Sequence, residues 1–429
     1  MLYESDAAIV RRDPALPGLA TLLDPVAFGD ALRHAAPGVM LESLTPVFTR
    51  YNPGTSCLIS YRCRVNGGDI NVHAKAYPVS AVGKLQKARE RPGVAGLLGA
   101  GRLTLDEIAT VVSIYPNDDR VKALSLLADD ASHAQVLREL LPQHPKLWQG
   151  TLRHLKYKPE RRAVLRLDSG GEPQAVLKLY TAGGYETARQ VNQRFTSRGA
   201  LQLAPDIGHS DQHQILAFGW LPGRQLSDAI RDPSFAASGL EPVGAALAEL
   251  HAQDATGLPR QTGADATAAL LAAADKWGVL VPAIAPRAHA LAQRLAARMA
   301  DTAVYDHPVH GDFKDEQVLL NGDTAVILDL DQAKQGDPVA DLGMFIAYLE
   351  RNVIRGEFTA ERLGALKEGL LEGYAAVSSR PIAAHLDVHV AALLLRRLVP
   401  QFFRFREPDW PARVEETVVR AGAILAGAT

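Results

Sequence analysis

The feature that most constrains the fold of this chain is a pattern of strands and turns that occurs twice in its first half. In the first copy, Tyr51-x-Pro53 is followed by the strand-like run CLISYRCRV, the turn NGGD and a second run, VHAKAY. In the second copy, Tyr157-x-Pro159 is followed by AVLRLD, the turn SGGEP and AVLKLY. Apolar runs that alternate with polar residues between glycine turns are typical of antiparallel strands. We therefore expect two similar β-sheet units.

The similarity between the two copies extends beyond the hairpin. Each copy carries a lysine in the strand after the turn, Lys75 in the first and Lys178 in the second. Each then continues into a helix-like stretch and a later apolar run that ends near a proline, Pro116 or Pro222. A unit that recurs with corresponding spacings indicates a duplicated module. The alternative is that two hairpins with glycine turns resemble each other by chance.

The rest of the chain differs from these copies in its periodicity. Apolar residues at helical spacing, such as Leu363, Leu366 and Leu370, dominate the second half. The pattern predicts an α+β protein in four parts: an irregular segment with one helix (1–40), a β-rich module (41–140), a second β-rich module (141–225) and a mostly helical part (226–429).

The composition is that of a globular protein, with 47% apolar and 22% charged residues among 429. The net charge of −2 provides no broad basic surface, so nucleic acid is not expected as a partner. The N-terminus lacks the pattern of a signal peptide, and no apolar run has the length of a membrane span. Cys57 and Cys63 are expected to be reduced residues of the core. These observations predict a cytoplasmic protein without a membrane partner.

Polar side chains gather around two short apolar runs in the segment PVHGDFKDEQVLLNGDTAVILDLDQAKQGDP, residues 308–338. The runs VLL and AVIL are strand-like, and Asn321-Gly322 between them predicts a type I′ hairpin turn. The acidic and amide side chains are therefore expected on the loops that flank a short hairpin.

The order of these side chains fits the transfer of a phosphoryl group to a hydroxyl group. That reaction needs a carboxylate near the hydroxyl, oxygen ligands for Mg²⁺ and a cation on the donor phosphates. Asp312 precedes Gln317, and Asp329 follows the strand-like run AVIL. Lys178 lies upstream in a strand of the form A-V-L-K, which completes the order found in kinases.

Several ordered motifs resemble the superfamily of aminoglycoside phosphotransferases and choline kinases, over approximately residues 150–375. They are W-L-P-G at Trp220, L-A-E-L-H ending at His251, H-G-D-x₄-Q at His310, L-D-x-D at Asp329 and G-D-P-x-x-D-L-G at Asp337. The resemblance implies a bilobal protein-kinase-like fold, with 141–225 as the N-lobe, 226–429 as the helical C-lobe and 308–341 as the catalytic loop. The module at 41–140 is then an additional, duplicated β-rich unit.

The resemblance also implies roles for the residues of the catalytic loop. Asp312 is the expected catalytic base, and Lys314 either faces the γ-phosphate or is a solvated loop charge. His310 is expected to stabilise the loop. Gln317 and Asp329 are the expected ligands of Mg²⁺, with Gln317 in the place of the usual asparagine.

Three further acids of this segment are given mainly structural roles. Asp331 is either an additional metal contact or a residue that stabilises the loop. Asp337 and Asp341 are expected to cap the following helix and to fix the loop.

The nucleotide, ATP, is expected to contact the second copy of the β-rich module. Lys178 is assigned to the α- and β-phosphates, with Glu186 as its candidate partner, and Trp220 is assigned to the nucleotide site. The hairpin Lys158-Pro-Glu-Arg-Arg162 has no glycine, so Arg161 or Arg162 either reaches the phosphates by its side chain or lies in solvent at the tip. In the first copy, the nearest acid on the following helix is Glu90, which lies well beyond the first turn. Lys178 is therefore preferred to Lys75.

The predicted activity is an ATP-dependent phosphotransferase that acts on a hydroxylated small molecule, such as a sugar, an antibiotic or a related metabolite. Lys plus Arg and Asp plus Glu are equally numerous in residues 341–429, so no acidic surplus favours a polycationic aminoglycoside. The run at 401–416 either lines a pocket or forms an amphipathic terminal helix. A catalytically silent pseudokinase and a protein kinase remain alternatives, and a homodimer is possible.

Overall fold

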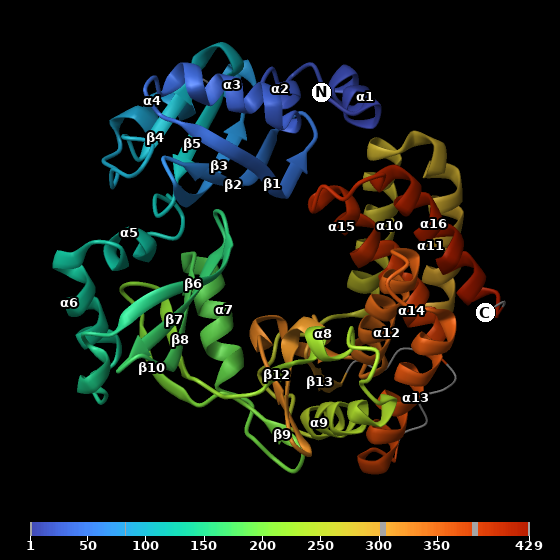
Figure 1. Ribbon diagram of the computed structural model, residues 1–429. Helices are drawn as coiled ribbons and strands as arrows, with labels where there is room; N and C mark the ends of the chain where they lie inside the picture. The colour runs from blue at the N-terminus through green and yellow to red at the C-terminus, as the bar shows by residue number, and fades with distance from the viewer. Residues whose placement is uncertain (1, 82, 301–305, 380–384, 428–429) are drawn as a thin grey trace. The chain divides into compact units, whose positions relative to one another are not determined.

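The computed structural model of the chain describes residues 2–81, 83–300, 306–379 and 385–427 (Figure 1). These residues form two compact units. The first unit contains Met1–Tyr185, Ile207–Phe218 and Phe403–Pro408, and the second unit contains Glu186–Asp206, Gly219–Phe402 and Asp409–Thr429. Helices and several sheets occur together, as the predicted α+β class requires. The predicted domain boundaries at residues 140 and 225 stay predictions.

Three helices open the first unit: α1 (Glu4–Arg12), α2 (Leu19–Leu23) and α3 (Pro25–Ala35). Only the last of them was expected, so the prediction of an otherwise irregular segment is wrong. The Asp24 carboxylate accepts from the backbone N–H groups of Val26 and Ala27 and thereby caps α3. The ring of Phe28 in α3 stacks on Tyr61, with centroids 4.4 Å apart, and this contact anchors the helix to the first sheet.

The first sheet is formed by β1 (Leu41–Asn52), β2 (Ser56–Val65), β3 (Gly68–Ala76), β4 (Arg102–Leu105) and β5 (Thr110–Ile114). Its strand order is β1-β2-β3-β5-β4. The turn between β2 and β3 has positive φ at Asn66 and Gly67, which is the pattern of a two-residue type I′ hairpin. Both cysteines lie in β2, and both are buried and free.

The second sheet repeats this topology. It is formed by β6 (Thr151–Lys158), β7 (Arg162–Ser169), β8 (Glu172–Tyr180), β10 (Asp206–Ser210) and β11 (Ile215–Gly219), in the order β10-β11-β8-β7-β6. In both sheets, three consecutive strands pair as a meander, the last strand pairs with the third, and the fourth lies at the edge. A helix follows the third strand in each case, α4 (Gly83–Glu90) or α7 (Ala182–Asn192). Chance similarity of two hairpins does not account for a shared five-strand order.

Two helices that the sequence pattern did not predict connect the sheets. These are α5 (Ala123–Leu127) and α6 (Asp130–Leu140), so the β-rich description of residues 41–140 is incomplete. Leu137 and Leu140 belong to the same buried cluster as Leu165 and Leu177 of the second sheet. The helices therefore cover one face of that sheet and exclude water from it.

The second unit is mostly helical, as predicted. Its longer helices are α9 (Glu241–His251), α10 (Gly263–Leu280), α11 (Ala285–Ala300), α12 (Val339–Ile354), α13 (Ala360–Val377), α14 (Leu386–Leu393) and α16 (Trp410–Leu425). The predicted stripe of Leu363, Leu366 and Leu370 is buried in α13. The run at 401–416 spans the end of α15 (Val399–Arg404) and the start of α16, where Phe402 and Trp410 are buried.

Two small sheets in this unit carry the polar segment at 308–338. One has the order β12-β14-β15-β9, with β12 at Arg224–Gln225, β14 at Val318–Asn321, β15 at Thr324–Ile327 and β9 at Leu201–Gln202. The other pairs β13 (His307–Val309) with β16 (Lys334–Gly336). The predicted hairpin is present, but Asn321 pairs with Thr324, so Gly322 and Asp323 form the turn. Only Gly322 of these two has positive φ, so the turn follows the type II′ pattern and not type I′.

None of the helices that the structure describes combines the length and the hydropathy required to cross a bilayer.

Candidate active site

Asp341 connects three of the sequence motifs in the second unit. Its carboxylate accepts from the backbone N–H of His310 at 2.6 Å and from that of Gly311 at 2.9 Å. The Nε2 atom of His251 lies 3.0 Å from the same carboxylate, and the hydroxyl of Tyr374 lies 3.0 Å from Nδ1 of His251. Burial alone would raise the pKa of Asp341, but the hydrogen bonds from the His251 side chain and from the backbone of His310 hold it below its ordinary value.

Both nitrogen atoms of the His310 ring form hydrogen bonds to the backbone of the loop. Nε2 lies 2.8 Å from the carbonyl oxygen of Leu328, and Nδ1 lies 3.2 Å from the backbone N–H of Asp312. A carbonyl oxygen can only accept and an N–H can only donate, so His310 is a neutral imidazole with its proton on Nε2. The fully buried ring therefore joins Asp312 to the segment that contains Asp329.

Gly311 cannot be replaced without moving this loop. Its φ is +77°, a value that favours glycine, and a Cβ atom on it would lie 2.4 Å from the carbonyl oxygen of Gln332. The glycine lets the chain turn tightly, so that Asp312 follows directly after the bonds to Asp341.

Asp312, the predicted catalytic base, is a nearly buried carboxylate between two cations. Lys314 donates from Nζ to its Oδ2 atom at 3.1 Å, and Nη2 of Arg397 lies 3.8 Å from Oδ1. Its side chain keeps 15% of its surface exposed, so a small reactant can reach it. A carboxylate in such a position is a group that can accept a proton from a reactant.

Lys314 is not a solvated loop charge, because only 10% of its side-chain surface is exposed. Burial by itself would lower its pKa, but Tyr348 and Asp312 outweigh this effect and raise it. The ammonium lies 3.5 Å from the hydroxyl of Tyr348, to which Gln401 also donates, at 2.6 Å. Lys314 is thus a permanently charged side chain in a fixed position beside Asp312.

Gln317 and Asp329, the predicted metal ligands, lie against each other. The amide nitrogen of Gln317 donates to Oδ2 of Asp329 at 3.1 Å. The backbone N–H of Leu328 donates to the carbonyl oxygen of Gln317, and Asp329 has a φ of +66°, which directs it out of the strand β15. One amide oxygen and one carboxylate are hard oxygen ligands, and Mg²⁺ in phosphoryl-transfer sites uses few protein ligands because the substrate phosphates supply others. The pair therefore fits such a cation.

The remaining acids of the segment have distinct partners. Asp331 accepts from the side-chain amide of Asn192 at 3.3 Å, which ties the loop to α7. Asp337 accepts from the backbone N–H of Val339 at the start of α12, as expected for a capping residue. Asp341 lies inside the first turn of α12 and binds the loop instead.

Asp315 is a buried acid that sequence reasoning did not single out. It is 2% exposed, and among the residues that the structure describes its Oδ2 atom has no hydrogen-bond partner. Burial raises its pKa above the ordinary value, although the guanidinium of Arg351 acts in the opposite direction.

The predicted nucleotide residues are divided between the two units. Lys178 belongs to the first unit, where its ammonium lies 5.5 Å from the ring centroid of Phe218 in β11. Glu186 and Trp220 belong to the second unit. Glu186 is exposed and is the fifth residue of α7, so it is not in the first turn of that helix as expected. The proposed pairing of Lys178 with Glu186 stays a prediction.

The tip of the hairpin between β6 and β7 is attached to the first sheet through Glu160. The ammonium of Lys75 donates to both carboxylate oxygens of Glu160, and Arg50 of β1 contacts the same carboxylate. Arg161, the next residue, is exposed at the tip. Arg161 is thus free to extend from a hairpin whose neighbouring residue is fixed.

Asp118 adds a second attachment between the two copies. Its buried Oδ2 atom accepts from the backbone N–H of Glu160 at 2.7 Å and from the hydroxyl of Tyr157 at 2.8 Å. The ring of Tyr157 also packs edge-on against Tyr115, with centroids 5.5 Å apart. Sequence reasoning identified Lys75 as the counterpart of Lys178 but missed Glu160 and Asp118, because their partners are distant in sequence.

Arg397 is a further residue that the sequence did not indicate. It lies in a π-helical turn, Leu394–Leu398, between α14 and α15. Its guanidinium donates to the carbonyl oxygen of Gly311 at 3.0 Å and to the side chain of Gln332 at 3.1 Å. Short π-helical segments are frequent at functional sites, and this one places a cation on the loop that carries Asp312.

The sequence of residues 158–379 matches the model of the phosphotransferase enzyme family. The match spans more than half of the chain and includes every motif on which the resemblance was based. No sequence among the curated proteins compared matches the chain.

Several solved structures are similar to parts of the chain. A choline/ethanolamine kinase family protein from Mesorhizobium loti is 18% identical, with a TM-score of 0.45, over 69% of this chain and 94% of that chain. A GDP complex of an aminoglycoside 2′-phosphotransferase is 14% identical, with a TM-score of 0.49, over 70% of this chain and 99% of that chain. A glucosamine kinase is 19% identical, with a TM-score of 0.44, over 65% and 82%.

Proposed function

The chain belongs to the phosphotransferase enzyme family, and we propose that it transfers the γ-phosphoryl group of ATP to a hydroxyl group of a small molecule. The observation that carries this proposal is the arrangement around His310, whose ring joins the backbone of Asp312 to the segment that contains Asp329, where Gln317 pairs with Asp329. A proton acceptor and a pair of oxygen ligands in one segment are two of the three kinds of group that this reaction requires, and a cation on the donor phosphates is the third.

In the proposed reaction, the hydroxyl oxygen of the acceptor attacks the γ-phosphorus. A bond forms between these atoms, and the bond from the γ-phosphorus to the bridging oxygen breaks, so ADP leaves. The hydroxyl proton passes to the carboxylate of Asp312, which orients the hydroxyl before attack. Lys314 and Arg397 flank this carboxylate and hold it in place.

Gln317 and Asp329 would hold Mg²⁺, with the amide oxygen of one and the carboxylate of the other as ligands. When bound, the cation neutralises charge on the phosphates. The amide nitrogen of Gln317 keeps the two side chains together, so an extra methylene relative to asparagine does not separate the ligands.

The remaining nucleotide contacts are proposed on the resemblance and on local structure. Lys178 is a strand residue with its ammonium beside Phe218, and we assign it to the α- and β-phosphates. Arg161 at the exposed hairpin tip is assigned to the phosphates in place of a glycine-rich loop. Trp220 and Glu186, which belong to the second unit, are also assigned to nucleotide binding.

The proposal is tested by ADP formation with ATP, Mg²⁺ and a panel of hydroxylated small molecules, measured for the wild type and Asp312→Asn. We expect loss of the acceptor-dependent rate by about 10²–10⁴-fold, the usual contribution of a general base. Asp323→Asn is the matched control, because Asp323 is an exposed acid in the turn of the neighbouring hairpin. Retention of the rate in Asp312→Asn, with unchanged thermal unfolding, would refute the proposed role.

The same assay distinguishes the two alternative functions, a catalytically silent pseudokinase and a protein kinase. A nucleotide-binding protein without catalysis would bind ATP but form no ADP with any acceptor. A protein kinase would form ADP with protein substrates and not with the small-molecule panel.

A further inference from the structure

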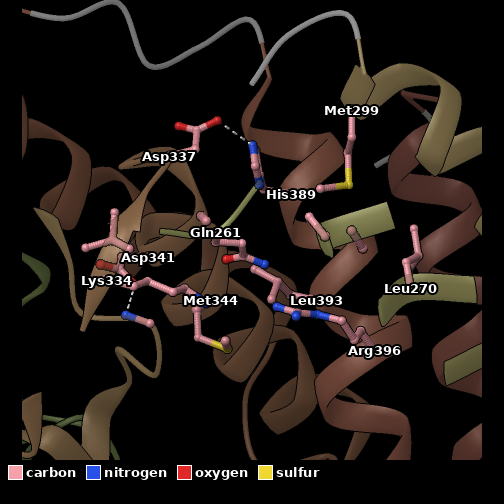
Figure 2. A pocket seen from close by; sticks show the side chains of 15 residues that line it. Gln261, Leu270, Met299, Lys334, Asp337, Asp341, Met344, His389, Leu393 and Arg396 are labelled. Atoms are coloured by element: carbon pink, nitrogen blue, oxygen red, sulfur yellow. Dashed lines mark hydrogen bonds and ion pairs between the residues drawn. The ribbon is translucent and has the colours of Figure 1, made fainter. Parts of the chain in front are cut away.

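A pocket lies beside the catalytic loop within the second unit (Figure 2). The backbone of Gly311 forms part of its wall, so the pocket is adjacent to Asp312. Its polar lining comes from β16, the loop that follows it, α12, α14 and the π-helical turn, and consists of Lys334, Asp337, Asp341, His389 and Arg396 together with Gln261. Met299, Met344 and Leu393 provide an apolar wall.

The two carboxylates of this pocket are already bound by groups of the protein. Oδ2 of Asp337 lies 3.0 Å from Nε2 of His389, which Figure 2 marks as an interaction, and Oδ1 accepts from the backbone N–H of Val339. Asp341 accepts from His310 and Gly311 and contacts His251. A cationic group on a ligand would have to displace these donors, so the acids do not form a cation site.

The ammonium group of Lys334, in the same pocket, is in a different situation. Within the described part of the chain, the ammonium of Lys334 makes no hydrogen bond and no ion pair. Burial lowers the pKa of Lys334 to about 8. The guanidinium groups of Arg396 and Arg397 lower it further, whereas the carboxylates of Asp341 and Asp312 act in the opposite direction. Three positive groups at close range therefore repel one another, and an anion among them would remove that repulsion.

Two consecutive arginines of the π-helical turn, Arg396 and Arg397, contact different parts of this region. Arg397 points to the loop, where it donates to Gly311 and Gln332, whereas Arg396 lines the pocket. The cationic side of the pocket is thus attached to the loop that carries Asp312. A ligand bound through Lys334 and Arg396 has its remaining groups within reach of Asp312.

We propose that this pocket binds a carboxylate or phosphate group of the hydroxylated acceptor, and that Lys334 and Arg396 recognise that group. The inference rests on the proposed phosphotransferase function and narrows its substrate class to anionic hydroxy compounds. Charge-assisted hydrogen bonds from ammonium and guanidinium groups would orient the acceptor so that its hydroxyl faces Asp312.

The test uses two acceptor series in which the skeleton is constant and the charge varies. One contains glucuronate, glucose 6-phosphate, glucose and glucosamine, and the other contains glycerate, glycerol 3-phosphate, glycerol and 3-aminopropane-1,2-diol. The kcat/KM for each compound is measured with ATP and Mg²⁺. We expect the anionic members to exceed their neutral counterparts by about tenfold or more, and the cationic members to be the poorest. The carboxylate and phosphate members within each series identify which anion is used.

The variants Lys334→Met and Arg396→Met keep an unbranched, flexible apolar stem and remove the charge. In each, the ratio of kcat/KM for the anionic over the neutral acceptor should fall about tenfold or more. Lys367→Met is the matched control, because Lys367 is a partly exposed lysine of α13 outside the pocket, and its ratio should not change.

The outcomes separate this inference from the proposed function. Preference for neutral or cationic acceptors, or an unchanged ratio in both correctly folded variants, overturns the anionic assignment and leaves the phosphotransferase proposal intact. The anionic assignment is also overturned if none of the anionic compounds has a higher kcat/KM than its neutral counterpart. Failure of the proposed function is recognised separately, by an ADP-forming rate that is the same in the wild type and in Asp312→Asn with every acceptor.

Discussion

The ammonium of Lys75 lies 2.9 and 2.8 Å from the two carboxylate oxygens of Glu160, and this ion pair joins the two copies of the duplicated sheet. Lys75 occupies the position in the first sheet that Lys178 occupies in the second. The same strand lysine thus has two different environments. In the first copy it binds the hairpin tip of the second copy.

The first prediction concerns that ion pair. Glu160→Gln leaves the charges of Lys75 and Arg50 unpaired in a region where the acid is 14% exposed, so we expect a loss of about 2–3 kcal/mol in the free energy of unfolding. Because the hairpin tip is proposed to cover the phosphates, KM for ATP should rise more than kcat falls. Denaturant unfolding and steady-state kinetics measure the two effects.

Glu42→Gln is the control for this substitution. Glu42 pairs with Arg64 in the same sheet, but those side chains are 32% and 50% exposed, so a loss of at most about 1 kcal/mol is expected. Equal losses in the two variants would show that the pair between the copies has no special role.

The second prediction compares the two equivalent lysines. Lys178→Met should reduce kcat/KM for ATP by about 10²-fold or more, because a cation on the donor phosphates is lost. Lys75→Met should cause a much smaller loss that follows its effect on stability. If Lys75→Met abolished turnover and Lys178→Met did not, the nucleotide site would belong to the first copy.

The third prediction concerns the paired oxygen ligands. Asp329→Asn replaces a carboxylate with an amide, so the Mg²⁺ concentration for half-maximal rate should rise by about tenfold or more. Gln317→Asn shortens the amide but keeps its oxygen, and should have the smaller effect. Titration of the rate with Mg²⁺ gives both values, and unchanged Mg²⁺ dependence in Asp329→Asn would contradict the assignment.

The fourth prediction follows from the buried acid Asp315. Its folded-state pKa is raised by burial, so it stabilises the native state only in its protonated form, and stability is lost as the pH rises from the unfolded pKa through the folded one. Asp315→Asn should therefore raise the melting temperature at neutral pH, by about 2–4 °C for each kcal/mol gained.

The advantage of Asp315→Asn should disappear as the pH falls below the ordinary range of aspartate, where both proteins carry a neutral side chain. Asp323→Asn, at an exposed turn, should be nearly neutral at every pH. A lower melting temperature of Asp315→Asn at neutral pH would indicate that the ionised acid stabilises Arg351.

Strands and turns were predictable from the sequence because their signals are local. Alternating apolar residues and the glycines at 67 and 170–171 predicted both hairpins. The structure then showed that the five strands have the same order in each copy. The short helices α1, α2 and α5 were not predicted, since a few turns of helix depend on tertiary packing more than on periodicity. The hairpin at Gly322 was predicted one residue out of register, because either of two adjacent residue pairs could form its turn.

The loop residues of the candidate site were also predictable, because one short segment contains Asp312, Lys314, Gln317 and Asp329. Contacts between distant segments were not. The bond from Lys75 to Glu160 spans 85 residues, that from Arg397 to Gly311 spans 86, and that between His251 and Asp341 spans 90. The placement of Arg396 and Arg397 depends on a π-helical turn that was not predicted from the sequence.

The most direct test of the account is ³¹P NMR of a reaction that contains the wild-type protein, ATP, Mg²⁺ and the best hydroxylated acceptor. We predict one phosphate monoester of the acceptor for each ADP formed, and neither product above background with Asp312→Asn. Formation of inorganic phosphate alone would identify a nucleotide hydrolase. Unchanged ATP with every acceptor, from a protein that is folded and binds the nucleotide, would contradict catalysis by Asp312 altogether.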